Sequence, residues 1–112
     1  KRNKHMEIIK NSANQEKITI KAILLEGATI VDVRSKKEFE TGNVADSINI
    51  PLSELKDHVE MLRTKQPLIL CCASGMRSSM AVKELKENGV EYLINGGSWQ
   101  EVNEQMQSDL SN

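Results

Sequence analysis

The segment "PLILCCASGMRSSMAVKELKENG" (67–89) joins a continuous apolar run, a short polar turn and an amphipathic stretch. The run 67–72 has the length and the branched apolar content of a strand that is buried on both faces. The stretch that follows ends at Gly89, a residue typical of helix C-termini. Its apolar side chains fall on one predicted helical face, at Met80, Ala81 and Leu85. This segment therefore predicts a central strand that passes through a tight turn directly into a helix.

The rest of the chain repeats this alternation of short apolar segments and helical spacing. Further strands are predicted at 28–33, 47–51 and 90–94. Helical segments are predicted over 17–28, as a turn or short helix over 34–42, over 52–63 with Ser53 as the N-cap, and after Ser98. The order β-α-β-α-β-α is typical of an α/β fold with a mostly parallel sheet and helices on both faces.

The length of 112 residues is that of one ordinary domain. Residues 1–16 are polar and weakly patterned, which predicts an N-terminal arm, followed by a domain over 17–107 and a tail over 108–112. The chain begins at Lys1, which leaves open a natural start at Met6 and the removal of a preceding anchor, signal or domain.

The composition excludes several classes of partner. The 15 basic and 16 acidic side chains nearly cancel, so there is no electrostatic case for binding nucleic acid or an anionic membrane. No apolar run is long enough to span a membrane. The two cysteines are adjacent and cannot staple distant segments, which favours a reducing compartment. We expect a cytoplasmic monomer that needs no cofactor.

The turn after Cys72 has the features of an anion-binding loop. In parallel sheets, ligands bind beyond the carboxyl ends of the strands, and Cys72 stands at such an end. Gly75 permits a curled backbone whose N–H groups point inward, and the helix that follows adds positive potential. Arg77 and the hydroxyls of Ser74 and Ser78 can line the loop. Such a field favours the thiolate, so Cys72 is a candidate nucleophile.

The adjacent cysteines also allow simpler interpretations. A cysteine at the end of a buried strand is often a small hydrophobic residue, but Cys72, Gly75 and Arg77 together favour the nucleophile. Cys71 precedes it on the strand and should point to the opposite face, as a core residue. A vicinal disulfide would be strained, and a resolving role for Cys71 would require the loop to rearrange. A zinc site is disfavoured because no Cys-x-x-Cys or paired His supplies the other ligands.

Three segments in order carry a family resemblance: "DVRSKKEFETGNVADSINIP" (32–51), "LILCCASGMRSSMAVKELKENG" (68–89) and "LINGGSWQEV" (93–102). They closely resemble the rhodanese family, over roughly residues 17–103. The resemblance implies an α/β domain with a parallel sheet of about five strands. It also implies a persulfide on Cys72, with a loop made of Ala73, Ser74, Gly75, Met76, Arg77 and Ser78.

The implied activity is the transfer of sulfane sulfur from a small donor or a persulfide-carrying protein to a thiophilic acceptor, such as cyanide, a thiol or a protein. Four residues separate Cys72 from Arg77, one fewer than in the phosphate-binding loops of tyrosine phosphatases. The shorter loop suits one sulfur atom. Ala73 supplies no charge, so we expect thiosulfate to be a poor donor and a protein or low-molecular-weight persulfide to be at least as good.

Two further residues are assigned supporting roles by the match. Asp32 stands at a strand end beside the active site, either as a polar wall group, as a partner of Arg77, or as a loop-capping carboxylate. Arg34 and Glu38 are four residues apart, and we expect them to form a structural pair. Trp99 is expected to anchor the last helix, and the position of Met76 allows it to form an apolar lip.

The resemblance, together with the loop residues, thus favours a rhodanese-type sulfurtransferase. A non-catalytic binding or regulatory module is the alternative, but the loss of the loop cysteine or arginine expected of such a module is not seen. A phosphatase or arsenate reductase is disfavoured by the loop length. A redox sensor that uses Cys71 and Cys72 ranks last.

Overall fold

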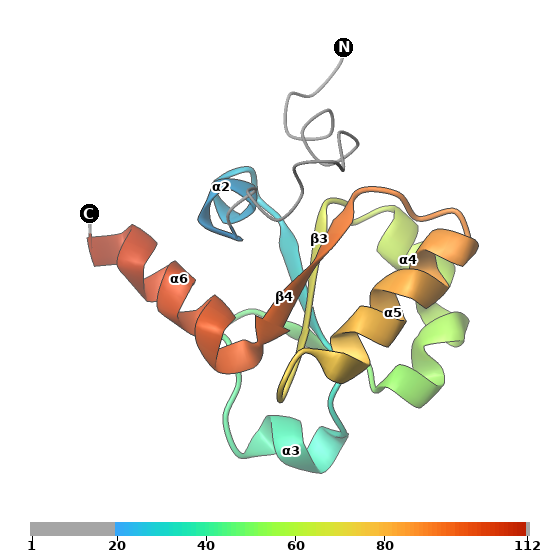
Figure 1. Ribbon diagram of the computed structural model, residues 1–112, viewed down its shortest axis with the longest axis horizontal. Helices are drawn as coiled ribbons and strands as arrows, with labels where there is room; N and C mark the ends of the chain where they lie inside the picture. Colours follow the sequence, from blue (N-terminus) through green and yellow to red (C-terminus); the bar gives the residue numbers. More distant parts are fainter. Residues whose placement is uncertain (1–19, 112) are drawn as a thin grey trace.

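The computed structural model describes residues 20–111, which form a four-stranded parallel sheet between two layers of helices (Figure 1). The sheet order is β2-β1-β3-β4, with the bounds β1 Thr29–Asp32, β2 Ile48–Asn49, β3 Leu68–Cys72 and β4 Leu93–Ser98. The helices are α2 Ile20–Leu25, α3 Lys36–Glu40, the 3₁₀ helix η2 Leu52–His58, α4 Val59–Arg63, α5 Met76–Glu87 and α6 Trp99–Ser111. The predicted α/β class is confirmed. We expected about five strands, and the described residues form four.

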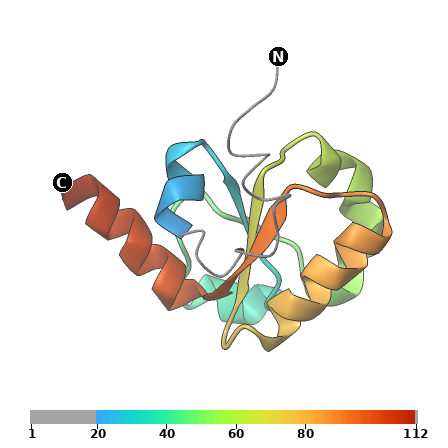
Figure 2. The same cartoon turned by 45° about the horizontal axis from the view of Figure 1, so that its top comes forward.

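The central strand β3 is buried along its whole length and divides the core into two parts. Leu70 and Cys72 belong to the cluster covered by η2, α4 and α5, which we call the Cys72 face. Ile69 and Cys71 belong to the cluster covered by α2 and α6, which we call the Cys71 face. Figure 1 and Figure 2 show these two helix layers on opposite sides of the strands. The predicted opposite orientation of the two cysteines is confirmed.

All four strands run in the same direction, so their carboxyl ends meet at one edge of the sheet. The short helix α3 lies across this edge, and the β3–α5 turn lies beside it (Figure 1). Asp32, Asn49 and Cys72 are the last residues of β1, β2 and β3. The fold therefore gathers the polar strand ends at one edge.

The fourth strand differs from the prediction. We expected a strand over 90–94 followed by a turn, whereas β4 spans Leu93–Ser98 and contains the Asn-Gly-Gly stretch. Its pairing with β3 is irregular: Leu70 pairs with Asn95, and Cys71 pairs with Gly97, so Gly96 is an inserted bulge residue. A Cβ on Gly96 would lie 2.7 Å from Ile69 Cγ2, which explains why glycine occupies this position.

Two details of the predicted helices, the N-cap at Ser53 and the burial of Met80, differ in the structure. The segment after Pro51 begins as the 3₁₀ helix η2 with no side-chain cap, so Ser53 is not the N-cap. Met80 is 57% exposed and does not belong to the buried face of α5, although Ala81 and Leu85 do. The Ser98 cap is confirmed, because its hydroxyl accepts from the Glu101 N–H at 3.1 Å.

The structure describes only part of the two terminal segments for which domain boundaries were predicted. The expected arm over 1–16 lies outside the described residues. Helix α6 continues to Ser111, past residue 107 where we placed the end of the domain. In the described part of the chain, none of the helices has the length and apolar content needed to cross a membrane.

Candidate active site

The chain turns from β3 into α5 within a few residues, and this turn holds Cys72 in place. Gly75 is the N-cap of α5 and has a φ of 99°, in the left-handed region where glycine is favoured. A Cβ on Gly75 would lie 3.3 Å from Gly97 Cα, so the turn also packs closely against β4. Both requirements explain the glycine that the sequence motif contains.

Two backbone N–H groups donate to the sulfur of Cys72, and a hydroxyl lies beside it. The Gly75 N–H donates to Sγ at 3.0 Å, and the Ser78 N–H donates at 3.4 Å. The Ser78 hydroxyl also lies 3.4 Å from Sγ. Ser78 belongs to the first turn of α5, where backbone N–H groups lack partners within the helix. The sulfur therefore occupies the place that an anion takes at a helix N-terminus.

These contacts control the ionisation of Cys72. Burial by itself raises the pKa of the thiol, but hydrogen bonds from the Ser78 hydroxyl and from the backbone of Ser78, Ser74 and Gly75 lower it by more. The pKa of Cys72 therefore lies below the ordinary value for a cysteine. A larger fraction of the sulfur is thiolate, the nucleophilic form, than in a free thiol.

Cys71 has the opposite environment although it is the adjacent residue. Burial, followed by the negative charge of Asp32, raises the pKa of its thiol to about 12. The register of β1 and β3 pairs Asp32 with Cys71, so both side chains lie on the Cys71 face. Cys71 is therefore an inert core thiol, as its predicted orientation implied.

Arg77 binds a partner that the sequence did not suggest. Its guanidinium donates to both carboxylate oxygens of Glu38, at 2.8 and 3.0 Å. This ion pair, together with hydrogen bonds from Ser35, holds the pKa of Glu38 at about 2, below its ordinary value of 4.5. The pKa of Arg77 is raised in turn, first by its hydrogen bond to Glu38. The pair ties α3 to the start of α5 at the rim of the site.

Asp32 is therefore not the partner of Arg77. Its carboxylate instead forms a bidentate ion pair with Arg34, at 3.0 Å to Nε and 2.8 Å to Nη2, and both side chains are buried. Arg34 also donates to the carbonyls of Gly42 and Glu38, and its guanidinium lies 4.8 Å from the Trp99 ring centroid. The expected pairing of the Arg34 and Glu38 side chains is replaced by this contact to the Glu38 backbone.

The Asp32–Arg34 pair thus has a scaffolding position. It lies on the Cys71 face and fastens α3 and the segment after it to the carboxyl edge of the sheet. Through α3 it positions Glu38, which in turn holds Arg77. Asp32 and Arg34 are thus linked to the loop through this chain of contacts.

Asn95 is a site residue that the sequence analysis did not identify. Its side-chain amide donates to the Gly75 carbonyl at 3.1 Å and accepts from the Ser78 hydroxyl at 2.7 Å. It also accepts from the Gly97 N–H at 2.9 Å. We expected residue 95 to lie in a turn after the strand predicted at 90–94, and only the pairing of β4 with β3 sets Asn95 opposite Leu70.

The remaining loop residues face the solvent. Ala73, Ser74 and Met76 are exposed, and Met76 has 74% of its surface accessible. Cys72 itself is buried at the base of the loop. This position of Met76 is compatible with the predicted apolar lip.

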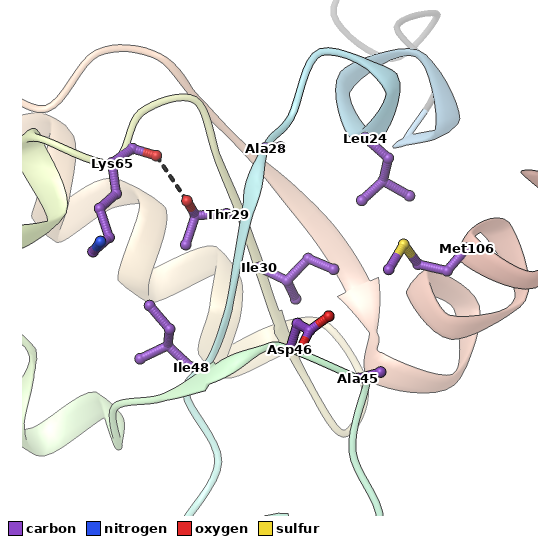
Figure 3. Close-up of a pocket in the computed structure, with 9 residues that line it drawn as sticks. All are labelled: Leu24, Ala28, Thr29, Ile30, Ala45, Asp46, Ile48, Lys65 and Met106. Atoms are coloured by element: carbon purple, nitrogen blue, oxygen red, sulfur yellow. Dashed lines mark hydrogen bonds between the residues drawn. The ribbon is translucent and has the colours of Figure 1, made fainter.

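A separate pocket of about 410 Å³ lies on the Cys71 face, between α2, α6 and the edge formed by β1 and β2 (Figure 3). Leu24 and Met106 point into it from the two helices, and Ile30 points into it from β1. No residue of the loop 72–78 lines this pocket. This pocket is therefore not the binding site for a substrate that reacts with Cys72.

Comparisons with known proteins identify relatives of this chain and of its fold. The rhodanese-like domain family matches residues 10–105. The uncharacterized protein YqhL of Bacillus subtilis is 40% identical over 68 residues, which cover 61% of this chain and 54% of YqhL. The chain thus spans about half the length of that relative.

Two proteins named for sulfur transfer are also similar. The thiosulfate sulfurtransferase GlpE of Pseudomonas syringae is 30% identical over 78 residues, covering 68% of this chain and 74% of GlpE. The structure of the human single-domain sulfurtransferase TSTD1 superimposes with a TM-score of 0.64 at 26% identity, over 76% of this chain and 89% of TSTD1. With the family match over residues 10–105, these similarities place the chain in the rhodanese-like domain family.

Proposed function

We propose that this protein is a sulfurtransferase that carries sulfane sulfur as a persulfide on Cys72. The observation that carries the proposal is the environment of Cys72 Sγ, which accepts hydrogen bonds from the first turn of α5 and has a lowered pKa. The names of GlpE and TSTD1 support the same reaction class.

The first half-reaction is the attack of the Cys72 thiolate on a sulfane sulfur. A sulfur–sulfur bond forms to Sγ, and the bond between the sulfane sulfur and the rest of the donor breaks. The donor leaves with the bonding electron pair, as sulfite when the donor is thiosulfate. The negative charge then resides on the outer sulfur of the persulfide, where the inward-pointing N–H groups of the loop stabilise it.

The second half-reaction returns Cys72 to the thiolate. A nucleophilic acceptor such as cyanide or a thiolate attacks the outer sulfur, and the electrons of the sulfur–sulfur bond return to Sγ. With cyanide the product is thiocyanate. No proton has to be moved in either half-reaction when donor and acceptor react as anions, so the site needs no general base.

The ion pair of Arg77 bears on the choice of donor. Its guanidinium donates to Glu38 through Nη1 and Nη2, and this carboxylate offsets the positive charge that would attract a dianionic donor. Ala73, next to Cys72, adds no charge. We therefore expect a low-molecular-weight or protein persulfide to load Cys72 faster than thiosulfate does.

The experiment that tests the proposal compares the two adjacent cysteines. The purified protein and the variants Cys72→Ser and Cys71→Ala are incubated with glutathione persulfide or thiosulfate, and intact mass is measured. We expect the mass of one added sulfur atom in the native protein and in Cys71→Ala, and none in Cys72→Ser. Thiocyanate formation from cyanide should follow the same pattern.

The opposite results have a definite meaning. Full activity in Cys72→Ser would contradict the assignment of the sulfur-carrying residue. A folded native protein that none of a panel of donors can load, including 3-mercaptopyruvate and a cysteine desulfurase, would instead favour the non-catalytic binding module.

A further inference from the structure

The side chain of Asn95 makes two hydrogen bonds to the active loop and one to its own strand, and the sulfur-transfer steps above use none of them. The residue lies on β4, opposite Leu70, and so projects to the Cys72 face of the sheet. Its amide touches the Gly75 carbonyl, the Ser78 hydroxyl and the Gly97 N–H. Two of these three groups belong to residues that bind Cys72 Sγ directly.

The orientation of the Asn95 amide follows from its backbone partners. The Gly97 N–H can only donate, so the atom that it meets at 2.9 Å is the oxygen Oδ1. The Gly75 carbonyl can only accept, so the atom that it meets at 3.1 Å is the nitrogen Nδ2. The two assignments agree with each other. Oδ1 is therefore also the atom that faces the Ser78 hydroxyl at 2.7 Å.

The Ser78 hydroxyl has one proton and two neighbours that can accept it. Oδ1 of Asn95 carries no hydrogen, so at 2.7 Å the hydroxyl donates its proton there. Only lone pairs of Ser78 Oγ then face Cys72 Sγ at 3.4 Å. A protonated thiol can donate to those lone pairs, whereas a thiolate has no proton to donate. The hydroxyl must leave Asn95 before it can stabilise the thiolate.

We propose that Asn95 is a positioning residue that competes with the Cys72 sulfur for the single proton of the Ser78 hydroxyl, and so favours the thiol over the thiolate between turnovers. The competition for the proton does not depend on the proposed function, whereas its role between turnovers rests on that function. The hydroxyl turns toward Sγ when Cys72 ionises. It returns to Asn95 when the charge moves to the outer sulfur of the persulfide, because the inner sulfur is then a weak acceptor.

The same amide has a second effect on the loop. Its Nδ2 group holds the Gly75 carbonyl, and the N–H of Gly75 is the donor nearest to Sγ, at 3.0 Å. Loss of Asn95 therefore releases the hydroxyl and also loosens the loop. These effects change the apparent pKa of Cys72 in opposite directions, so a single substitution cannot separate them, whereas a double-mutant cycle with Ser78 can.

The experiment measures the rate of alkylation of Cys72 by iodoacetamide between about pH 5 and 10 in a Cys71→Ala background. The Ser78→Ala substitution is made with Asn95 present and in Asn95→Ala. We expect Ser78→Ala to raise the Cys72 pKa more in Asn95→Ala, where the hydroxyl is free to donate, than with Asn95 present. The difference should amount to at least about a threefold change in alkylation rate below the pKa. Equal effects in the two backgrounds would overturn the proposal.

Asn95→Asp is the matched control. Its carboxylate still accepts from Ser78 and Gly97 but can no longer donate to the Gly75 carbonyl. The effect of Ser78→Ala should stay small in this variant, and a large effect would also overturn the proposal. If Asn95→Ala does not fold, Asn95→Leu removes the same acceptor with a side chain of similar size. Alkylation does not require sulfur transfer, so this result is independent of whether the proposed function holds.

Discussion

The two faces of the sheet at the end of β3 treat the same chemical group in opposite ways. Cys71 and Cys72 are adjacent, and both are fully buried. On the Cys72 face the N–H groups of Gly75 and Ser78 donate to the sulfur. On the Cys71 face the nearby polar groups are Asp32 and Arg34, which bind each other. Burial raises the pKa of both thiols, and only at Cys72 do hydrogen bonds to the sulfur outweigh this effect.

The largest expected effect is on alkylation of the two thiols. With a pKa of about 12, only a fraction of roughly 10⁻⁵ of Cys71 is thiolate at neutral pH. In the single-cysteine variants Cys72→Ala and Cys71→Ala, intact mass spectrometry should show Cys72 reacting with iodoacetamide at least about 10³ times faster than Cys71. The midpoint of the Cys72 rate against pH should lie below that of a cysteine peptide. Similar rates in the folded variants would contradict the difference between the faces.

The second effect concerns the scaffold of the Cys71 face. Arg34→Met leaves the buried Asp32 carboxylate without its partner, which should cost about 3–5 kcal/mol of unfolding free energy. Urea denaturation followed by circular dichroism measures this loss. The matched control is Arg63→Met, which removes the exposed partner of Glu60 and should cost far less. Equal losses in the two variants would show that the Asp32–Arg34 pair does not hold the fold.

The third effect separates backbone strain from contact with the thiol. Gly75→Ala and Gly27→Ala both place a side chain at a left-handed φ, 99° and 88°, and each should cost about 1–2 kcal/mol. A Cβ at residue 27 meets nothing within 4 Å, whereas at residue 75 it meets Gly97 Cα at 3.3 Å. Only Gly75→Ala should therefore displace the N–H from Sγ and raise the Cys72 pKa in the alkylation profile. The same shift in Gly27→Ala would refute this assignment.

The smallest effect is expected at the rim, at the exposed pair of Arg77 and Glu38. The folded-state pKa of Glu38, about 2, lies below its ordinary value of 4.5. The pair therefore stabilises the fold above about pH 4.5 and loses this contribution as the pH falls toward 2. In Arg77→Gln, the carboxyl carbon of Glu38 should titrate by NMR closer to 4.5. Arg63→Gln serves as the control and should leave the Glu38 titration unchanged.

The local parts of this arrangement could be predicted from the sequence. The apolar run before Cys72, the glycine three residues after it and the helical spacing that follows are contiguous, and together they define strand, turn and helix. The period-2 alternation of a strand also gave opposite faces for Cys71 and Cys72. The Ser98 cap was visible because its partner Glu101 is only three residues away.

The contacts between distant segments could not be predicted in this way. Glu38 and Arg77 are 39 residues apart, and Asn95 lies 17 residues after Ser78. Arg34 was assigned to the Glu38 side chain on helical spacing, whereas Ser35 is an N-cap that places Arg34 outside the helix. The glycines of β4 suggested a turn, because the bulge that accommodates them is defined only by pairing with β3.

The bulge at Gly96 determines which face of the sheet each later residue of β4 occupies. In a regular strand, residues two apart share a face, but the inserted Gly96 shifts this alternation. Asn95 pairs with Leu70 and Gly97 pairs with Cys71, so the two residues lie on opposite faces of the sheet. Deletion of Gly96 would leave the composition of the loop intact and yet turn the segment after it over. Trp99 would then leave Arg34, and Asn95 would lose its own backbone partner. A transplant of this active loop into another protein would therefore have to include the bulged strand β4, because the contacts around Cys72 depend on the residue inserted there.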